Sequence, residues 1–233
     1  MYNVKLVCEG TTDLHVFQAV LDAHLGGAEY LLGMLQPDGA RYGGDAGPHG
    51  GGWKGVRGWC QAAKKAGGVE AVGALTDDVD LLVIHVDADI ACDAEHNAAK
   101  PCPPPAPTVQ AVEALVLGWL GVSSLPDRVL LWVPCYSTEA WVLRALFPTL
   151  SQSASCLAAS PTSGCVECIS DPASVLLGKT PKLVRRKQGQ LKKIASAYQD
   201  AQAAITQRWG DLRAHVWSAK RIEPELVKWV PAQ

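Results

Sequence analysis

Acidic side chains stand at the points where three predicted strands of the chain end. Glu9 follows the first of these strands, and Asp87 and Asp89 follow a later one. Glu139 lies one turn beyond the third, and Asp13 comes shortly after Glu9. Because ligands of open α/β sheets bind at the carboxyl ends of the strands, these side chains are expected to share one site.

Carboxylates brought together in this way need a cation between them. Without one, the charges repel each other and the pKa values of the carboxyl groups rise. Oxygen ligands with no matching set of His or Cys favour Mg²⁺ or Mn²⁺, which retain water and bind substrate phosphates. Two such ions about 4 Å apart would hold the attacking and leaving oxygens of a phosphodiester. The predicted chemistry is therefore metal-dependent phosphoryl transfer.

A simpler role competes with metal binding for two of these residues. Asp and Glu are common in the first turn of a helix, where they accept hydrogen bonds from free N–H groups and complement the helix dipole. Asp13 and Glu139 could be such capping residues. Asp87 and Asp89 differ, because alternate residues leaving a buried strand point the same way, and two like charges on one face are costly. That pair indicates a functional site.

The strands that position these residues are short apolar runs bounded by turn signals. Asp80 to Val86 (DLLVIHV) is apolar at nearly every position, as expected of a central parallel strand covered by helices. Predicted helices alternate with the strands, which indicates an α/β fold: a Rossmann-like sheet of mainly parallel strands with right-handed crossovers. The expected strands are residues 4–8, 30–35, 80–86 and 128–133, and the helices follow Thr12 and span residues 53–66, 109–120 and 138–146.

Composition limits the possible classes of partner. The chain has 233 residues, 48% of them hydrophobic, enough for one large core, and a formal net charge of −2 gives no global attraction to nucleic acid. No signal peptide is recognised, and no apolar run reaches the length of about 18 residues that spans a bilayer. The eight cysteines are irregularly placed, as reduced thiols would be. A cytoplasmic protein without a membrane role is expected.

The character of the chain changes after about residue 150. We expect residues 1–150 to form the metal-binding α/β core, and residues 151–233 to form a Ser- and Cys-rich connection with a basic helical extension packed on that core. Basic side chains of this extension could neutralise phosphates or stabilise charge in a transition state, although a solvated helix face is the alternative. The candidates are Lys192 as a catalytic residue and Lys179, Lys182, Arg185, Arg186 and Lys193 as nucleic-acid ligands.

Two motifs carry a resemblance to the TOPRIM domain of topoisomerases, bacterial primases and the overcoming-lysogenization-defect nucleases. The stretch from Glu9 to Asp13 (EGTTD) resembles the family's EGxxD, and Asp87-Ala88-Asp89 resembles its DxD. The chain is also similar to the small stand-alone TOPRIM-like proteins of the DUF4276 family, through HGGGWKGVRGW and VPCYSTEAWVLRAL. The resemblance covers about residues 4 to 147.

The resemblance implies Mg²⁺-dependent cutting or joining of nucleic acid, DNA in preference to RNA. Asp87 and Asp89 would be metal ligands, and Glu9 a ligand or general acid/base. Related proteins accompany ATPases in mobile or antiviral gene clusters, which implies a partner ATPase. No Gly closely follows the DxD and no catalytic Tyr motif is identified, so the expectation is a nuclease and not a topoisomerase.

Two other classes of function stay open from the sequence. One is a non-catalytic subunit that uses the same fold to bind a partner ATPase or a nucleotide. The other is a phosphatase or phosphotransferase of the haloacid-dehalogenase kind, but those enzymes carry DxDx[TV] on their first strand. Here the motif follows a later strand and reads DADIA.

Several further features have competing interpretations. The loop from Gly39 to Gly52 lacks a phosphate-binding fingerprint and is interpreted as an active-site lid or a structural excursion. Zinc binding by Cys156, Cys165 and Cys168 competes with ordinary reduced thiols. His85 is expected in the core or hydrogen-bonded to a metal ligand, and is not itself expected to be one.

Overall fold

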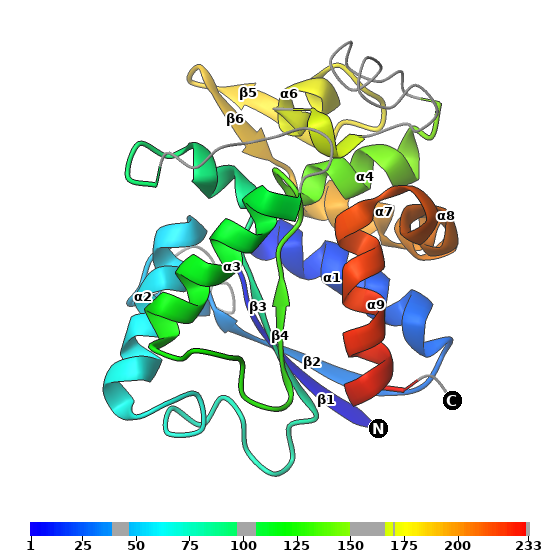
Figure 1. The fold of residues 1–233 in the computed structure, drawn as a ribbon. Coiled ribbons are helices and arrows are strands. Elements are labelled where there is room, and N and C mark those ends of the chain that lie inside the picture. Colours follow the sequence, from blue (N-terminus) through cyan, green and yellow to red (C-terminus); the bar gives the residue numbers. More distant parts are fainter. Residues whose placement is uncertain (39–46, 97–105, 150–165, 170, 232–233) are drawn as a thin grey trace.

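The computed structural model describes residues 1–38, 47–96, 106–149, 166–169 and 171–231. Its centre is a four-stranded sheet in which every neighbouring pair is parallel, in the order β2-β1-β3-β4 (Figure 1). The predicted α/β fold with a parallel, Rossmann-like sheet is confirmed. The strands are β1 (Tyr2–Val7), β2 (Tyr30–Gln36), β3 (Leu81–His85) and β4 (Val129–Trp132).

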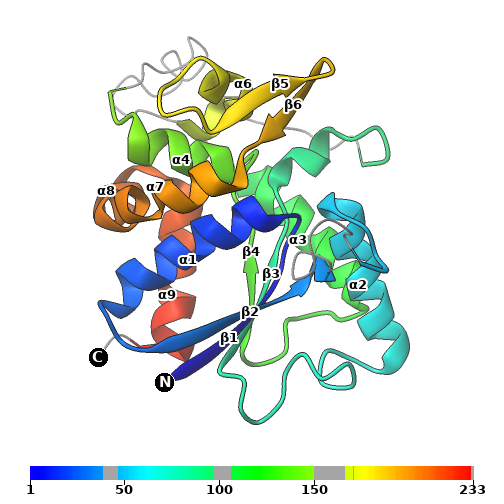
Figure 2. The ribbon, with the colours of Figure 1, turned by 180° about the vertical axis from the view of Figure 1, so that it is seen from behind.

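Helices cover both faces of the sheet because the strands are apolar on both. In β3, Leu82 and Ile84 face one hydrophobic cluster and Leu81 and Val83 face the other. Helices α2 (Gly52–Ala66) and α3 (Ala106–Leu120) contribute to the first cluster, and α1 (Thr11–Leu25) contributes to the second. Figures 1 and 2 show these two helical layers from opposite sides.

The direction of winding reverses between β1 and β3. Strand β2, which follows β1 in the chain, lies next to β1 toward one edge of the sheet. Strand β4, which follows β3, lies next to β3 toward the opposite edge. Right-handed crossovers then require α1 and α3 to lie on opposite faces, as they do. Such a reversal leaves a crevice beyond the carboxyl ends of the two central strands, where open α/β sheets bind ligands.

The C-terminal helices belong to the same core as the sheet. Buried residues of these helices share one cluster with α1 and with β-strand residues such as Leu6 and Trp132. Helix α7 is held along α1 by the Thr206 hydroxyl, which donates to the Ala19 carbonyl at 3.0 Å. The extension expected over residues 151–233 is thus packed against the layer of α1. Its helices are α6 (Pro172–Leu177), α7 (Ala195–Gln207), α8 (Trp209–His215) and α9 (Trp217–Trp229), which follow α4 (Thr138–Leu146) and the 3-10 turns η2 (Ala88–Cys92) and η3 (Val166–Cys168).

The basic part of this extension is not helical, which corrects the sequence prediction. Most of its cations lie on an antiparallel hairpin of β5 (Val184–Lys187) and β6 (Gln190–Lys193), and Lys179 and Lys182 precede it outside any helix. Lys and Arg have good helix propensity, but Gln188 and Gly189 both have positive φ (52° and 78°) and form a two-residue turn that a helix cannot contain. Local turn chemistry therefore overrides the propensity of the basic run.

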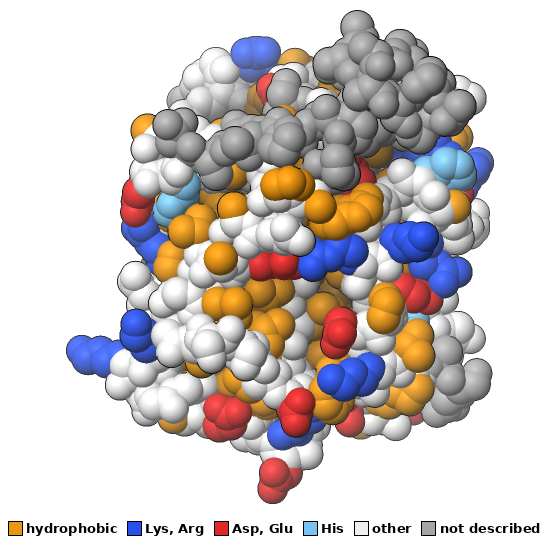
Figure 3. Space-filling view, in the orientation of Figure 1, with side chains coloured by type: hydrophobic (Ala, Val, Ile, Leu, Met, Phe, Trp, Pro, Cys, Tyr) orange, Lys and Arg blue, Asp and Glu red, His pale blue; other side chains and the backbone are white. Residues whose placement is uncertain are grey.

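One sheet edge lies at the bottom of a groove. Edge strand β4 runs between α3 and α9, and a hollow of about 410 Å³ lined by apolar side chains such as Leu117 and Ile222 opens there. Figure 3 shows this hollow in the centre of the molecule. Arg221 spans the groove and binds Glu113 at 2.8 Å. The hollow is lined by none of the acidic residues that follow β1 and β3.

The cysteines correct one expectation and leave another untested. Cys168 is disulfide-bonded, so the eight cysteines are not all reduced thiols. Cys156 and Cys165, the other members of the hypothetical zinc site, lie outside the described residues, as does most of the loop from Gly39 to Gly52. No helix in the described ranges is long and apolar enough to cross a membrane.

If the C-terminal helices and the sheet form one cooperative core, truncating Ile205 of α7 destabilises the whole molecule. Ile205 is fully buried in the cluster shared with α1. We expect Ile205→Ala to lower the free energy of unfolding by about 2–5 kcal/mol within a single transition. The exposed Gln199→Ala on the same helix is the matched control. Separate melting of the helices, detected as non-coincident fluorescence and circular-dichroism transitions, would contradict a shared core.

Candidate functional site

The ends of β1 and β3 are joined by a hydrogen bond between their acidic residues. The backbone N–H of Asp87 donates to Glu9 Oε1 at 2.8 Å. The Glu9 carbonyl accepts the N–H of Gly52 at 2.9 Å, so the start of α2 also fixes this turn. Glu9 and Asp87 therefore face each other across the crevice between the two central strands.

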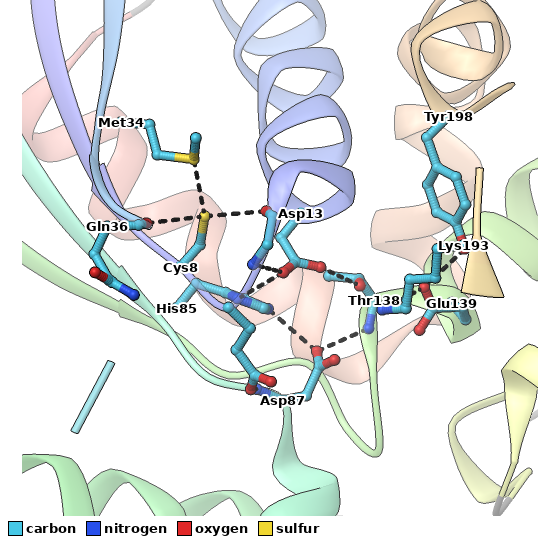
Figure 4. A network of polar contacts seen from close by, with 12 residues as sticks. Cys8, Asp13, Met34, Gln36, His85, Asp87, Thr138, Glu139, Lys193 and Tyr198 are labelled. Carbon is cyan, nitrogen blue, oxygen red and sulfur yellow. Dashed lines mark hydrogen bonds and ion pairs between the residues drawn. The ribbon is translucent and has the colours of Figure 1, made fainter. Parts of the chain in front are cut away.

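Asp87 is held by two donors on one carboxylate oxygen. Its Oδ1 accepts the backbone N–H of Thr138 at 2.9 Å and lies 3.2 Å from His85 Nε2. The donor from Thr138 belongs to the first turn of α4, where N–H groups are free. Figure 4 shows Asp87 between His85 and Thr138. No hydrogen bond within the described ranges involves Asp87 Oδ2, which leaves that oxygen available to a ligand.

Asp13 uses both of its carboxylate oxygens within the protein. Oδ2 accepts the N–H of Gly10 at 2.9 Å, which is the capping role considered from the sequence. Oδ1 accepts the Thr138 hydroxyl at 3.0 Å, so Asp13 also links α1 to α4. The side chain is 2% exposed. Asp13 therefore caps α1 and also lies beside the acidic site.

A buried inner group of Asp13, His85 and Asp87 could hold a metal ion. One ligand atom from each lies within 4.8 Å of the others. His85 Nδ1 is 3.8 Å from Asp13 Oδ2 and has no hydrogen-bond partner in the described structure. The imidazole thus lies between two carboxylates (Figure 4). Burial opposes its charge, but Asp13 and Asp87 outweigh burial and raise the pKa of His85.

A pocket of about 200 Å³ opens on the outer side of Asp87. Three of its carboxylates, those of Glu9, Asp87 and Asp89, have oxygens with no hydrogen bond among the described residues. The donor set is hard oxygen, which fits Mg²⁺ or Mn²⁺ better than a soft metal. The pocket is lined by Glu9, Asp87, Asp89, Tyr136, Ser137, Glu139, Asp171, Pro172, Ala173 and Lys193.

Lys193 brings a positive charge to this acidic pocket. Its Nζ lies 2.8 Å from Glu139 Oε1, and the Tyr198 hydroxyl donates to the same oxygen at 2.8 Å. Burial disfavours charge on the lysine, but the carboxylates of Glu139, Asp13 and Asp87 dominate and raise its pKa well above the usual value. Burial also acts to raise the pKa of Glu139, yet Lys193 and the hydroxyl donors hold it below its ordinary value.

The carboxyl groups of Glu9 and Asp89 in this pocket have raised pKa values. Burial raises the pKa of Glu9 well above its ordinary value, and repulsion from Asp87, Asp13 and Asp89 adds to this effect. Burial and then Asp87 raise the pKa of Asp89 to about 7. A cation bound among these carboxylates would counteract both effects.

Backbone strain at Tyr136 helps to place Asp89. Tyr136 has φ of 57°, in the left-handed region that costs a non-glycine residue about 1–2 kcal/mol. In this conformation its carbonyl accepts the N–H of Asp89 at 2.8 Å. Strain of this kind persists where the surrounding structure fixes it and is concentrated at functional sites.

The structure brings together most, but not all, of the residues predicted from the sequence. Glu9, Asp87, Asp89 and Glu139 line one pocket, and Asp13 lies directly behind Asp87. The lysine that lines the pocket is Lys193, and the predicted catalytic Lys192 does not line it. Successive residues of a strand point to opposite sides: Lys193 pairs with buried Val184, and Lys192 with exposed Arg185. Lys179, Lys182, Arg185 and Arg186 do not line the pocket either.

Three residues at or near the pocket were not predicted from the sequence. Asp171, in the stretch DPAS, has the signature of a helix N-cap followed by Pro, and it does accept the N–H of Ser174 at 2.9 Å. Tyr198 and Tyr136 gave no signal, because only the folded chain places them near Glu139 and Asp89. Comparisons with family models, with curated proteins and with solved structures find no match to this chain.

The pocket is expected to bind Mn²⁺ through Asp87. Asp87→Asn keeps an oxygen for Thr138 but removes the negative charge, so the affinity measured by isothermal titration should fall by at least about 10–100-fold. Asp200→Asn, an exposed acid on α7, is the matched control and should bind as wild type does. Equal affinity in all three proteins would exclude Asp87 as a ligand.

Mn²⁺ affinity is also expected to increase with pH. Because the pKa of Asp89 is raised to about 7, a proton occupies this carboxyl in a large fraction of the free protein near neutrality, and a cation must displace it. The pKa of Glu9 is raised in the same direction. Binding should therefore be tighter at about pH 8 than at about pH 6, with proton release detected by titration in buffers of different ionisation enthalpy. Affinity that is constant over this range would contradict the assignment.

Proposed function

We propose that this protein is a TOPRIM-like nuclease that uses Mg²⁺ or Mn²⁺ to cleave phosphodiester bonds of DNA. The observation that carries the proposal is a single pocket in which free oxygens of Glu9, Asp87 and Asp89 lie beside Lys193. This pocket stands at the reversal of winding between β1 and β3. The placement of the EGTTD turn after β1 and of the DxD after β3 supports the resemblance to TOPRIM domains.

The carboxylates supply the negative charge that holds a divalent cation and its bound phosphate. When bound, the ion would polarise the phosphate and lower the pKa of a coordinated water. Asp87 and Asp89 present ligand oxygens, and Asp87 is fixed in place by Thr138 and His85. Glu9 has one oxygen held by the Asp87 N–H, and its other oxygen is free to bind the ion or to accept a proton.

Lys193 supplies the positive charge that a pentacovalent phosphate needs. Its ammonium is a compact charge with three donors, suited to phosphate oxygens. Glu139 positions this ammonium, and the Tyr198 hydroxyl donates to the same oxygen of Glu139. We therefore assign Glu139 to positioning Lys193, although the sequence suggested a metal ligand. A fixed donor at the point where charge develops is worth about 10²–10³ in rate.

A second candidate is a non-catalytic subunit that binds a partner ATPase or a nucleotide. The inner group supports this candidate. Asp13, His85 and Asp87 form hydrogen bonds within the protein, as side chains with a purely structural role would. Such a subunit would keep the fold without cleaving nucleic acid. Co-purification with an ATPase would support a partner for either candidate.

Cleavage assays separate these candidates. Wild-type protein is incubated with plasmid, linear and single-stranded DNA and with RNA, in Mg²⁺ or Mn²⁺. We expect metal-dependent DNA cleavage that Asp87→Asn abolishes. Lys193→Met should reduce the single-turnover rate at saturating DNA by about 10²–10³-fold, because the charge beside the phosphate is lost.

Two controls make this experiment specific. Lys220→Met removes an exposed lysine of α9 and should cleave at the wild-type rate. Lys192→Met should retain the rate at saturating DNA, since its side chain lies outside the pocket. Equal cleavage by wild type and Asp87→Asn would indicate a contaminating nuclease and refute the mechanism. Absence of cleavage by a protein that binds Mn²⁺ would favour the non-catalytic candidate.

A further inference from the structure

The β5–β6 hairpin is a short twisted ribbon that projects from the molecule. Lys187 pairs with Gln190, so the turn contains only Gln188 and Gly189. Their positive φ values, 52° and 78°, are those of a type I′ turn, whose twist matches that of the strands it joins. In Figures 1 and 2 the turn stands clear of the other labelled elements.

The ribbon carries positive charge that the described protein does not neutralise. Arg185 lies directly opposite Lys192, and like charges in such a pair destabilise a hairpin. Both are exposed, as is Lys187, and no described carboxylate forms an ion pair with any of the three. Elsewhere in the described chain, Arg57, Arg144, Arg213 and Arg221 each bind a carboxylate. Arg208 is exposed without a described ion pair, but it stands alone, whereas the ribbon gathers three such cations. The ribbon is therefore suited to an anion from outside the protein.

The ribbon begins at the acidic pocket. Lys193, the last residue of β6, lines the pocket, while Val184 opposite it is buried. In β5 the residues that follow Val184 are exposed, and in β6 only Leu191 is partly buried. Each strand has four residues and so spans about 13 Å at about 3.3 Å per residue. Because this length starts at Lys193, a polyanion bound to the ribbon would lie within about 13 Å of the pocket.

We propose that this ribbon enters the major groove of double-stranded DNA and thereby makes duplex DNA the substrate class, an inference that rests on the proposed nuclease function. The major groove of B-form DNA is about 12 Å wide and admits a two-stranded β-ribbon. The major groove of duplex RNA is too narrow and deep for side chains to enter. A single strand offers no groove. Arg185 and Lys192 bind phosphates of the groove walls, while Lys193 at the base of the ribbon faces the pocket.

Binding of the full-length protein, without divalent cations so that cleavage cannot occur, tests this inference. Fluorescence anisotropy compares a 20-base-pair DNA duplex (about two helical turns), one of its strands, and the RNA duplex of the same sequence. We expect the DNA duplex to bind at least about tenfold more tightly than either alternative. The double variant Arg185→Ser/Lys192→Ser should lose that preference. It should also lower the slope of log K against log salt by about 1.8, for two lost phosphate contacts.

A matched variant and a groove-specific probe complete the design. Lys65→Ser/Lys220→Ser removes two exposed lysines of α2 and α9 and should preserve the affinity and the slope. Because all four side chains are exposed, neither double variant should melt at a lower temperature than wild type. Dimethyl sulfate methylates guanine N7 in the major groove, so wild type should protect guanines that the ribbon variant leaves reactive.

The outcomes distinguish this inference from the proposed function. Equal binding of single strands or duplex RNA, or an unchanged salt slope in the ribbon variant, would overturn it. Ribbon-dependent duplex binding by a protein that never cleaves with Mn²⁺ would support the inference and refute the nuclease. Cleavage confined to single strands and unaffected by the ribbon variant would refute the inference and keep the nuclease.

Discussion

Repulsion among carboxylates at the carboxyl end of the sheet is the constraint that organises the surrounding structure. Parallel strands put Glu9, Asp87 and Asp89 at one edge, where burial raises the pKa values of all three. The protein offsets part of this cost with donors: His85 and the Thr138 N–H on Asp87, and Lys193 on Glu139. The oxygens that stay free are those that face the pocket. A divalent cation there would remove the remaining repulsion.

The C-terminal part of the chain completes this site. Hairpin β5–β6 supplies Lys193 and α7 supplies Tyr198, and both contact the same carboxylate oxygen of Glu139. Both depend on the packing of α7 along α1, the helix that also carries Asp13. Residues far apart in sequence therefore meet at one pocket because the same hydrophobic cluster contains the sheet, α1 and the C-terminal helices. Loss of this packing would affect the site even though the acidic residues remained on their strands.

The fold and the acidic residues could be predicted because they depend on local patterns. The apolar run before Asp87 identifies a buried parallel strand, and strand ends then place Glu9 and Asp87 at one edge. The hairpin could not be recognised, because Gln188 adopts positive φ without being glycine. Without the hairpin, the sequence could not distinguish Lys192 from Lys193. The register of β6 shows that Lys193 lies opposite the buried Val184 and Lys192 opposite the exposed Arg185. Tyr198 depends on tertiary packing and leaves no local signal.

The position of a bound cation tests the central claim most directly. Crystals of the protein soaked in Mn²⁺ can be measured at a wavelength where manganese scatters anomalously. We expect a peak in the outer pocket, about 2.1 Å from carboxylate oxygens of Asp87 and of Glu9 or Asp89, with Lys193 and Glu139 beside it. A peak between Asp13 and His85 that leaves the outer oxygens free would contradict it, as would no peak in this region at saturating Mn²⁺.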